Sequence, residues 1–471
     1  MTECTQVSFA FATDSRRAVV ANFDGGTITT EAGGLLLHQT EQKTGILRQF
    51  AGCFRDYRDP SRIDHSVEEL IRQRVYALAL GYEDLNDHDQ LRADPLLAML
   101  SGKADVEGQQ RRRQRDRGKA GAGKSTLNRL ELTPADANEK SRYKKIVVDT
   151  EAVDEVMVDL YIQRQRRPPK RIVLDLDATD DRIHGHQEGR FYHGYYGDYC
   201  YLPLYIFIGE VLVCSRLRPS NQDASAGAVN EVERIVKRLR RVWPTAEIIL
   251  RADSGFCRDE LMSWCEQQQV DYVFGLAKNS RLLAKIRKPM RKAQRRYGET
   301  GKAAREFVEF GYRTRRSWSR KRRVVAKAEY LDKGMNPRFV VTSLSTEQME
   351  ARHLYEDFYC ARGEMENRIK EQQLDLFADR TSTALMRSNQ IRLYFSSIAY
   401  CLMQALRELG LVGTKMAQAQ CSTIRVRLLK IGARVRVTVR KVWIWMASGH
   451  PARELFATVY SNLQKLTPLL I

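Results

Sequence analysis

The chain has 471 residues, of which 78 are Lys or Arg and 58 are Asp or Glu, giving a formal net charge of +20 with 43% hydrophobic residues. This length exceeds one ordinary domain and predicts roughly two to four. The positive excess favours a polyanionic partner, most often nucleic acid, over a surface whose charge only keeps the protein soluble.

The cysteines and the apolar runs narrow the class of protein further. The nine cysteines include no Cys-x-x-Cys pair, which argues against a zinc site of the usual spacing and is typical of reduced thiols in a cytosol. No apolar run approaches the roughly 18 residues of a membrane span, and the N-terminus lacks the pattern of a signal peptide. The sequence therefore predicts an intracellular protein.

The first 150 residues favour helices. Residues 66–69 form a capping-box pattern before an apolar run that ends at Gly81, and Asp94 precedes a proline that opens another apolar segment. An arginine-rich stretch follows at 111–117. We therefore expect residues 1–150 to form a mainly helical DNA-binding region.

A phosphate-loop pattern follows the arginine run. Residues 118–125 match G-x4-G-K-S letter for letter. A nucleotide-binding loop of this type needs an apolar strand directly before it, and an arginine run stands there instead. A flexible basic linker is the favoured interpretation, and nucleotide binding is the alternative.

Strand and helix patterns alternate between residues 170 and 285. Apolar runs predict five strands, separated in the second half by two helices, in the order strand, strand, strand, helix, strand, helix, strand. The strands are expected at 171–177, 199–208, 211–217, 247–253 and 272–276. This order fits an α/β fold with a ribonuclease-H-like mixed five-stranded sheet, in which the first and fourth strands are neighbours. We expect residues 170–285 and 341–400 to form this core.

A basic segment interrupts the core pattern. Residues 281–323 contain 17 Lys or Arg and 3 Glu, and strand-like pieces lie within and after them. We expect residues 286–340 to form a basic, β-rich insertion. A C-terminal region of helices and strands should follow at 401–471. Within it, 434–440 alternates arginine with valine, which predicts a half-buried strand with a basic face.

Three acidic residues are candidate catalytic and metal-binding residues. Asp177 and Asp253 each close an apolar strand, and Glu366 lies in a predicted helix. Three carboxylates in one pocket repel each other, and divalent cations remove that repulsion while activating a nucleophile for phosphodiester cleavage. Asp175 competes with Asp177 because both face one side of the strand. Taken singly, each acid has an ordinary capping or surface role as its alternative.

The helix around Glu366 carries further candidates. Tyr359, Arg362, Glu366 and Gln373 share one helical face, and Lys370 lies one turn beyond Glu366. Tyr359, Arg362 and Lys370 are candidate DNA-binding residues, and Arg362 and Lys370 are candidate phosphate ligands. The alternative for Lys370 is an ordinary i,i+4 ion pair with Glu366.

Tyr359-x2-Arg362-x3-Glu366 resembles the Y-x2-R-x3-E-x6-K signature of DDE transposases from bacterial insertion sequences. Longer phrases resemble the insertion-sequence family 1380 group, namely LDLDATDD at 174–181, GYYGDY at 194–199, RPSN at 218–221 and RADSGF at 251–256. The resemblance implies a core interrupted by a β-rich insertion, two Mg²⁺ ions (with Mn²⁺ as a substitute), and a homodimer acting on double-stranded DNA in the bacterial cytoplasm, at the nucleoid. One departure is that the final lysine of the signature falls at Gln373.

Trp318 lies in the basic insertion. In similar transposases, a tryptophan of the insertion stacks on a base flipped out of the element end. The resemblance thus implies DNA contacts from Trp318 and from its neighbours Arg315, Arg316 and Arg320. The alternative for Trp318 is burial in the insertion.

These features together predict a DNA transposase that binds the terminal inverted repeats of its own element, cuts the ends and joins the 3′-hydroxyls to target DNA. One alternative is a metal-dependent DNA nuclease that never joins strands. The other is a nucleotide-driven DNA-binding regulator that uses residues 118–125.

Overall fold

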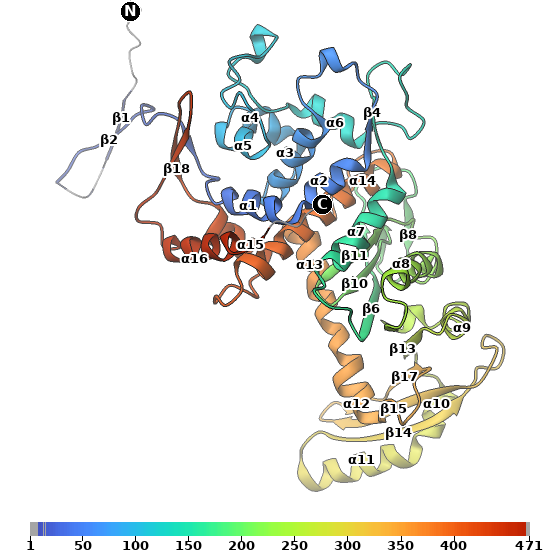
Figure 1. Cartoon of the computed structure of the whole chain (residues 1–471). Helices are drawn as coiled ribbons and strands as arrows, with labels where there is room; N and C mark the ends of the chain where they lie inside the picture. Colours follow the sequence, from blue (N-terminus) through green and yellow to red (C-terminus); the bar gives the residue numbers. More distant parts are fainter. Residues whose placement is uncertain (1–7, 13, 15, 468–471) are drawn as a thin grey trace, which may run out of the picture. The chain divides into compact units, whose positions relative to one another are not determined.

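The structure is a computed structural model, in which residues 8–12, 14 and 16–467 are described. Two compact units make up the chain (Figure 1): Met1–Val148 together with Ile398–Ile471, and Asp149–Ser397. The sequence had indicated separate regions at 1–150 and 401–471. The structure instead places both termini in the first unit, because strand pairing and backbone hydrogen bonds join them, among them Gly33 N to Leu429 O at 3.0 Å.

The first unit is mainly helical. Ser66 and Glu69 form the expected capping box at the start of α3 (Val67–Ala79), and Asp94 caps α5 through the backbone N–H groups of Leu96 and Leu97. The other α-helices described here are α1 (Gly34–Thr44), α2 (Ile46–Gly52), α4 (His88–Leu91), α6 (Lys124–Glu131), α15 (Cys421–Ile424) and α16 (Arg453–Gln464), and α14 (Met386–Ala405) begins in the second unit and ends in the first.

Short strands complete the first unit. β18 (Ala433–Val437) and β19 (Val442–Met446) form an antiparallel hairpin, and β3 (Ile28–Thr29) pairs with the other edge of β18. Arginines 434 and 436 are exposed while Ala433 and Val435 are buried, which confirms a strand with one basic face over the first part of 434–440. The strand ends at Val437, and Val439, expected to be buried, is fully exposed in the turn. Two further pairs are β1 (Phe9–Phe11) with β2 (Val19–Ala21), and β4 (Phe54–Asp56) with β5 (Ile146–Val148).

A mixed sheet organises the second unit. Its order is β11-β10-β6-β12-β13-β17-β15-β14, and β16 pairs with β15. As expected, β6 (Arg171–Ala178) lies beside β12 (Glu247–Ala252) and parallel to it. The expected strand at 199–208 is divided, because residues 198–201 belong to a separate small sheet and residues 204–208 to this one. The others are β10 (Leu204–Ile208), β11 (Val211–Arg216), β13 (Asp271–Leu276), β14 (Ala304–Tyr312), β15 (Arg322–Leu331), β16 (Gly334–Met335) and β17 (Arg338–Thr342). A small separate sheet is formed by β7 (Asp181–Arg182), β9 (Asp198–Tyr201) and β8 (Phe191–His193).

The sheet has nine strands and not the expected five. β17 pairs antiparallel with β13, and β15 and β14 follow it, so the strands of the 286–340 segment continue the core sheet. The segment is also less β-rich than expected, since α11 (Arg287–Thr300) occupies its first part, after α10 (Ser280–Lys285).

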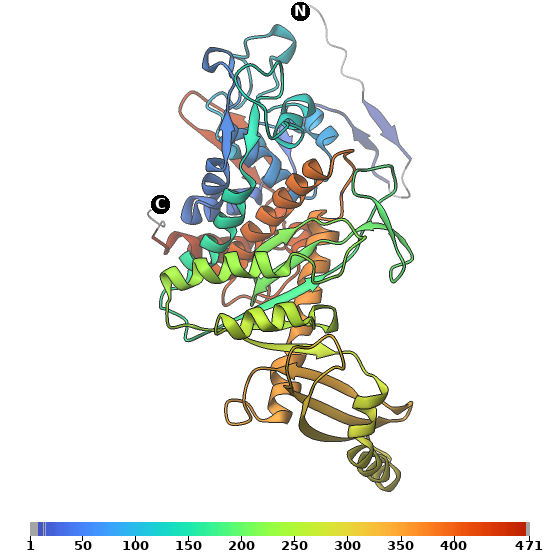
Figure 2. The ribbon, with the colours of Figure 1, turned by 90° about the vertical axis from the view of Figure 1, so that its right-hand side faces the viewer.

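The two faces of the sheet carry different residues of β6, because side chains alternate along a strand. Leu174 and Leu176 of β6 lie in one core cluster with residues of α8 (Ala228–Val242) and α9 (Asp259–Gln267), and Figure 2 shows these two helices in front of the sheet. α7 (Thr150–Arg164) packs against β11. Asp175 and Asp177 point to the opposite face because side chains alternate along a strand. There the chain runs through α12 (Ala351–His353), η5 (Leu354–Tyr359), η6 (Cys360–Arg362) and α13 (Gly363–Leu376).

No helix among the described residues is long and apolar enough to span a membrane.

Candidate active site

Asp177 and Asp253 end neighbouring parallel strands. Leu176 of β6 lies opposite Ala252 of β12 in the register, so the residues that follow each of them emerge at the same edge of the sheet. Asp253 begins the short turn η4 (Ser254–Phe256), where its Oδ1 accepts a hydrogen bond from Gly255 N at 2.8 Å. The predicted neighbourhood of the two strands is confirmed.

Arg362 connects Asp177 with Glu366. Its Nη1 lies 3.4 Å from Oδ2 of Asp177, and its Nη2 lies 3.0 Å from Oε1 of Glu366 in the first turn of α13. Glu366 is half-exposed, whereas Asp177 and Arg362 are both largely buried. One guanidinium is thus shared by two of the three candidate acids.

The pKa of Asp177 is affected by the charges of the other two acids. Burial raises its pKa to about 6, the positive charge of Arg362 opposes that rise, and the negative charges of Asp253 and Glu366 add to it. Burial lowers the pKa of Arg362, but the negative charges of Asp177, Glu366 and Asp253 hold it above its ordinary value. The three carboxylates therefore act on one another through a common electrostatic environment.

Asp175, the alternative to Asp177 as a catalytic residue, is paired with Arg251. Its two oxygens accept hydrogen bonds from Nε and Nη2 of Arg251 at 2.5 and 2.7 Å, and both side chains are buried. Nη1 of Arg251 also donates to the carbonyl of Phe358. Sequence reasoning missed Arg251, although its place on the same face of β12 as Asp175 on β6 is a signal that strand alternation provides. This pair ties the sheet to η5.

Tyr359 packs closely over the end of β13. A Cβ atom on Gly275 would lie 2.5 Å from the Tyr359 hydroxyl and 2.9 Å from Ser254 N, so only glycine leaves room there. The pKa of Tyr359 is raised by burial and by Asp253, while Arg362 opposes the rise. Tyr359 thus contacts the neighbourhood of both Asp253 and Arg362.

Gln373, at the position of the signature lysine, serves a different acid. Its Nε2 donates to Oδ1 of Asp181 at 2.7 Å and to the carbonyl of Asp180 at 3.1 Å. Asp181 is fully buried, its Oδ2 has no hydrogen-bond partner among the described residues, and burial raises its pKa to about 8. Lys370 is exposed on α13. Sequence reasoning did not single out Asp181.

The four DNA-binding candidates of the insertion differ from one another. Trp318 is only 4% exposed and packs edge-on against Tyr312, with ring centroids 5.7 Å apart. It is therefore buried in the insertion, and a flipped base has no access to its ring. Arg315 and Arg316 are exposed. Nε of Arg320 donates to Glu266 at 2.7 Å.

The donor chemistry of Asp177, Asp253 and Glu366 suits Mg²⁺, which prefers carboxylate oxygens. Nevertheless, within the described part of the chain, no three His, Cys, Asp or Glu side chains are grouped closely enough to hold a metal ion. Arg362 lies against two of the three acids and supplies the positive charge there. A cation at these acids therefore requires the guanidinium to move away.

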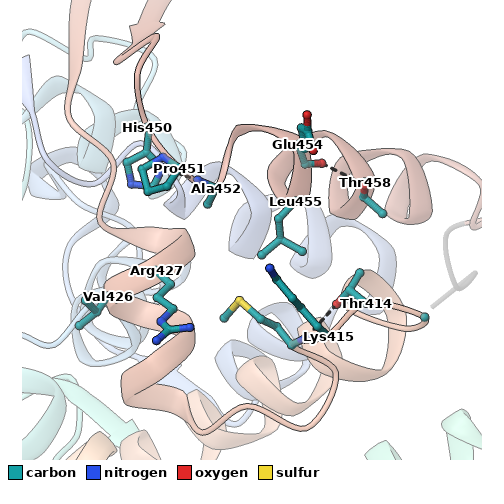
Figure 3. Close-up of a pocket in the computed structure, with 12 residues that line it drawn as sticks. Thr414, Lys415, Val426, Arg427, His450, Pro451, Ala452, Glu454, Leu455 and Thr458 are labelled. Atoms are coloured by element: carbon teal, nitrogen blue, oxygen red, sulfur yellow. Dashed lines mark hydrogen bonds between the residues drawn. The ribbon is translucent and has the colours of Figure 1, made fainter.

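Two other regions are alternative sites. A cavity of about 750 Å³ in the first unit is lined by Lys415, Arg427, His450 and neighbouring residues (Figure 3), and none of the predicted site residues lines it. In the phosphate-loop segment, Gly121 N donates to Arg92 O at 2.9 Å and Ala122 N to Gln73 Oε1 at 2.8 Å. These N–H groups are not free to cradle a phosphate, which argues against nucleotide binding. The expected flexible linker is not found either, because Ala120 and Ala122 are buried and α6 begins at Lys124.

Comparison with known proteins identifies the family of the chain. Residues 11–468 match the family model described as Transposase DDE domain group 1. A search of curated proteins finds no match. Because the family model spans nearly the whole sequence, including every candidate acid, the chain belongs to the family Transposase DDE domain group 1.

Proposed function

We propose that the protein is an insertion-sequence transposase that binds the terminal inverted repeats of its element, cuts the 3′ strands by metal-dependent hydrolysis and joins the 3′-hydroxyls to target DNA. The observation that carries this proposal is the shared environment of Asp177, Asp253 and Glu366 around Arg362. The family supports a transposase. We also propose that the chain is a member of the family 1380 group, that its core is ribonuclease-H-like, and that it acts as a homodimer.

Each residue then has a task. Asp177, Asp253 and Glu366 would hold divalent cations, which activate the attacking water or 3′-hydroxyl and stabilise the leaving oxygen. Arg362, released from two carboxylates, is close enough to bind the scissile phosphate by charge-assisted hydrogen bonds. Tyr359 and the Asp175–Arg251 pair keep the helical segment against the ends of β6 and β12.

A basic face of α11 supports binding to the DNA backbone. Met290 and Ala293 are buried, whereas Arg287, Arg291 and Arg295 are exposed one turn apart. No ion pair joins these three arginines to another described residue. By contrast, Lys292 and Arg296 are both paired with Glu306 at 3.0 Å. Unpaired arginines in a row are suited to consecutive phosphates.

Glu366→Gln tests the proposed catalytic role directly. The variant should lose Mg²⁺-dependent cleavage of a duplex that carries the cognate element end, while its affinity for that duplex stays within about threefold. Glu364→Gln is the matched control, because Glu364 is an exposed acid on the same turn of α13, 3.7 Å from Arg368, and it should keep its activity. Cleavage by Glu366→Gln at the wild-type rate would refute the assignment.

The alternative of a nuclease without strand joining is separated by a second assay. A pre-cut end with a free 3′-hydroxyl and a supercoiled target should give a joined product with the wild type and none with Glu366→Gln. Normal cleavage without any joined product would favour the nuclease.

A further inference from the structure

The hairpin of β18 and β19 carries an aromatic and basic surface on one face (red in Figure 1). Trp443 and Trp445 are 46% and 48% exposed, and their rings lie nearly parallel, 9° apart with centroids 6.0 Å from each other. Large aromatic rings this exposed, side by side, are uncommon on a surface that has no partner.

Arginines accompany the two rings in the strand register. Arg436 lies opposite Trp443, and Arg434 lies opposite Trp445. Residues directly opposite each other in an antiparallel pair share one face, so all four side chains lie on the same face of the hairpin. The ammonium of Lys441 lies 5.4 Å from the centre of the Trp443 ring. We call these five residues the Trp–Arg face.

The opposite face of the hairpin accounts for its stability. Val435 is buried, and Val437 and Val442 pack against a cluster of Ala98, Val106 and Ala120 within the first unit. Removing side chains from the Trp–Arg face thus leaves this packing in place.

Charge identifies the kind of partner. Residues 421–450 contain seven Lys or Arg and no Asp or Glu, so the face attracts a polyanion and repels a basic surface such as a second copy of itself. Flat rings add a preference for a polyanion with exposed flat groups. A DNA duplex hides the faces of its bases in the stack, whereas an unpaired strand presents them, and bases stack on aromatic side chains with little dependence on sequence.

We propose that the Trp–Arg face is a binding site for an unpaired DNA strand, with bases stacked on Trp443 and Trp445 and phosphates bound by Arg434 and Arg436. It lies outside the residues proposed to cut DNA, and it rests on the proposed function only in that the partner is DNA. A strand of this kind arises wherever an element end is opened or cut.

The test measures binding of the full-length protein to a fluorescent oligothymidylate of about 16 nucleotides, without metal so that catalysis plays no part. Trp443→Ala/Trp445→Ala should weaken binding at least about tenfold, because stacking is lost. Trp443→Phe/Trp445→Phe should keep most of the affinity. Tyr460→Ala, which removes another half-exposed ring of the first unit, should bind like the wild type.

Salt dependence tests the two arginines separately. Arg434→Gln/Arg436→Gln should reduce the slope of log affinity against log salt concentration by about 1.4, the value for two phosphate contacts on a single strand. An unchanged slope would contradict their role.

Three outcomes would overturn the proposal. The first is wild-type affinity of the double alanine variant for the oligonucleotide. The second is an equal loss of affinity for a duplex of the same length, which would indicate a general DNA surface. The third is a change in sedimentation mass of the double alanine variant, which would identify the face as a contact between copies. Loss of binding alongside normal Mg²⁺-dependent cleavage of a duplex end would leave the catalytic proposal intact and support this one.

Discussion

The guanidinium of Arg362 lies 3.4 Å from the carboxylate of Asp177, where it partly neutralises an acid that burial has already weakened. The same guanidinium bonds to Glu366. In this arrangement one positive side chain occupies the place of the cations that we propose the three acids bind. Binding of metal and release of Arg362 toward the substrate would then be one coupled event.

Metal affinity should fall as the pH drops through about 6. The pKa of Asp177 is raised to about 6, so below that pH a proton competes with the cation, and affinity should decline by about tenfold per pH unit. Calorimetric titration with Mn²⁺ between pH 5 and pH 8 measures this. A metal affinity that does not change between pH 5 and pH 8 would contradict the role of Asp177.

Arg362→Gln should shift that profile to higher pH. Arg362 lowers the pKa of Asp177, so its removal lets the pKa rise and makes the proton a stronger competitor. The variant should also lose cleavage, since the phosphate ligand is gone. Arg368→Gln is the control, because Arg368 is also on α13 but contacts Glu210 and Glu364 and should leave the pH profile unchanged.

Asp175→Asn should destabilise the protein, whereas Asp177→Asn should not. Breaking a buried ion pair by removing one partner costs about 3–5 kcal/mol, and Asp175 accepts hydrogen bonds from two of the three guanidinium nitrogens of Arg251. Burial raises the pKa of both acids, but Asp177 has only a longer, 3.4 Å contact with Arg362, so removing its charge should cost little stability. Urea unfolding without metal compares the two variants. Equal stability of both would show that Asp175 is not the structural member of the pair.

Asp181→Asn should stabilise the protein at high pH. The folded pKa of Asp181 is about 8 against roughly 3.9 for an unfolded chain, so the wild type is fully stabilised below about pH 4 and loses stability as the pH rises to about 8. Asn cannot ionise and still accepts the hydrogen bond from Gln373. At pH 8 the variant should gain at least about 1.4 kcal/mol, one pKa unit's worth.

The gain from Asp181→Asn should vanish near pH 4, where the wild-type acid is already neutral. Gln373→Lys should remove the same pH dependence by a different route, because a positive charge beside Asp181 lowers its pKa. Asp332→Asn, at an exposed acid of the same unit, should show neither effect. A gain that persists unchanged at pH 4 would exclude ionisation as its cause.

Gly275→Ala should displace Tyr359, because the added methyl would lie 2.5 Å from its hydroxyl. Overpacking of this kind costs about 1–3 kcal/mol, and the shift of Tyr359 and Arg362 should also slow cleavage. Adding Tyr359→Phe should recover part of the stability by removing the oxygen that clashes. No recovery in the double variant would place the clash with the backbone at Ser254.

Local pattern in the sequence was sufficient for some features of this protein. Alternation and apolar runs located the strands that end at Asp177 and Asp253, and the order of elements predicted that β6 and β12 would pair. The capping box at Ser66 and the basic face of β18 likewise follow from residues within a few positions of each other. Periodicity and capping are local properties, so a single sequence carries them.

Other features depended on which distant segments meet. Asp175 and Asp177 have the same pattern in β6, and only Arg251 on the neighbouring strand distinguishes a structural acid from a candidate catalytic one. Burial of Trp318 against Tyr312, the union of the two terminal regions, and the continuation of the sheet into 304–342 are likewise contacts between remote parts of the chain. Local sequence does not encode burial or long-range pairing by itself, because both are set by the summed packing of the whole fold. The tertiary structure therefore decided which charged and aromatic residues remain available for DNA.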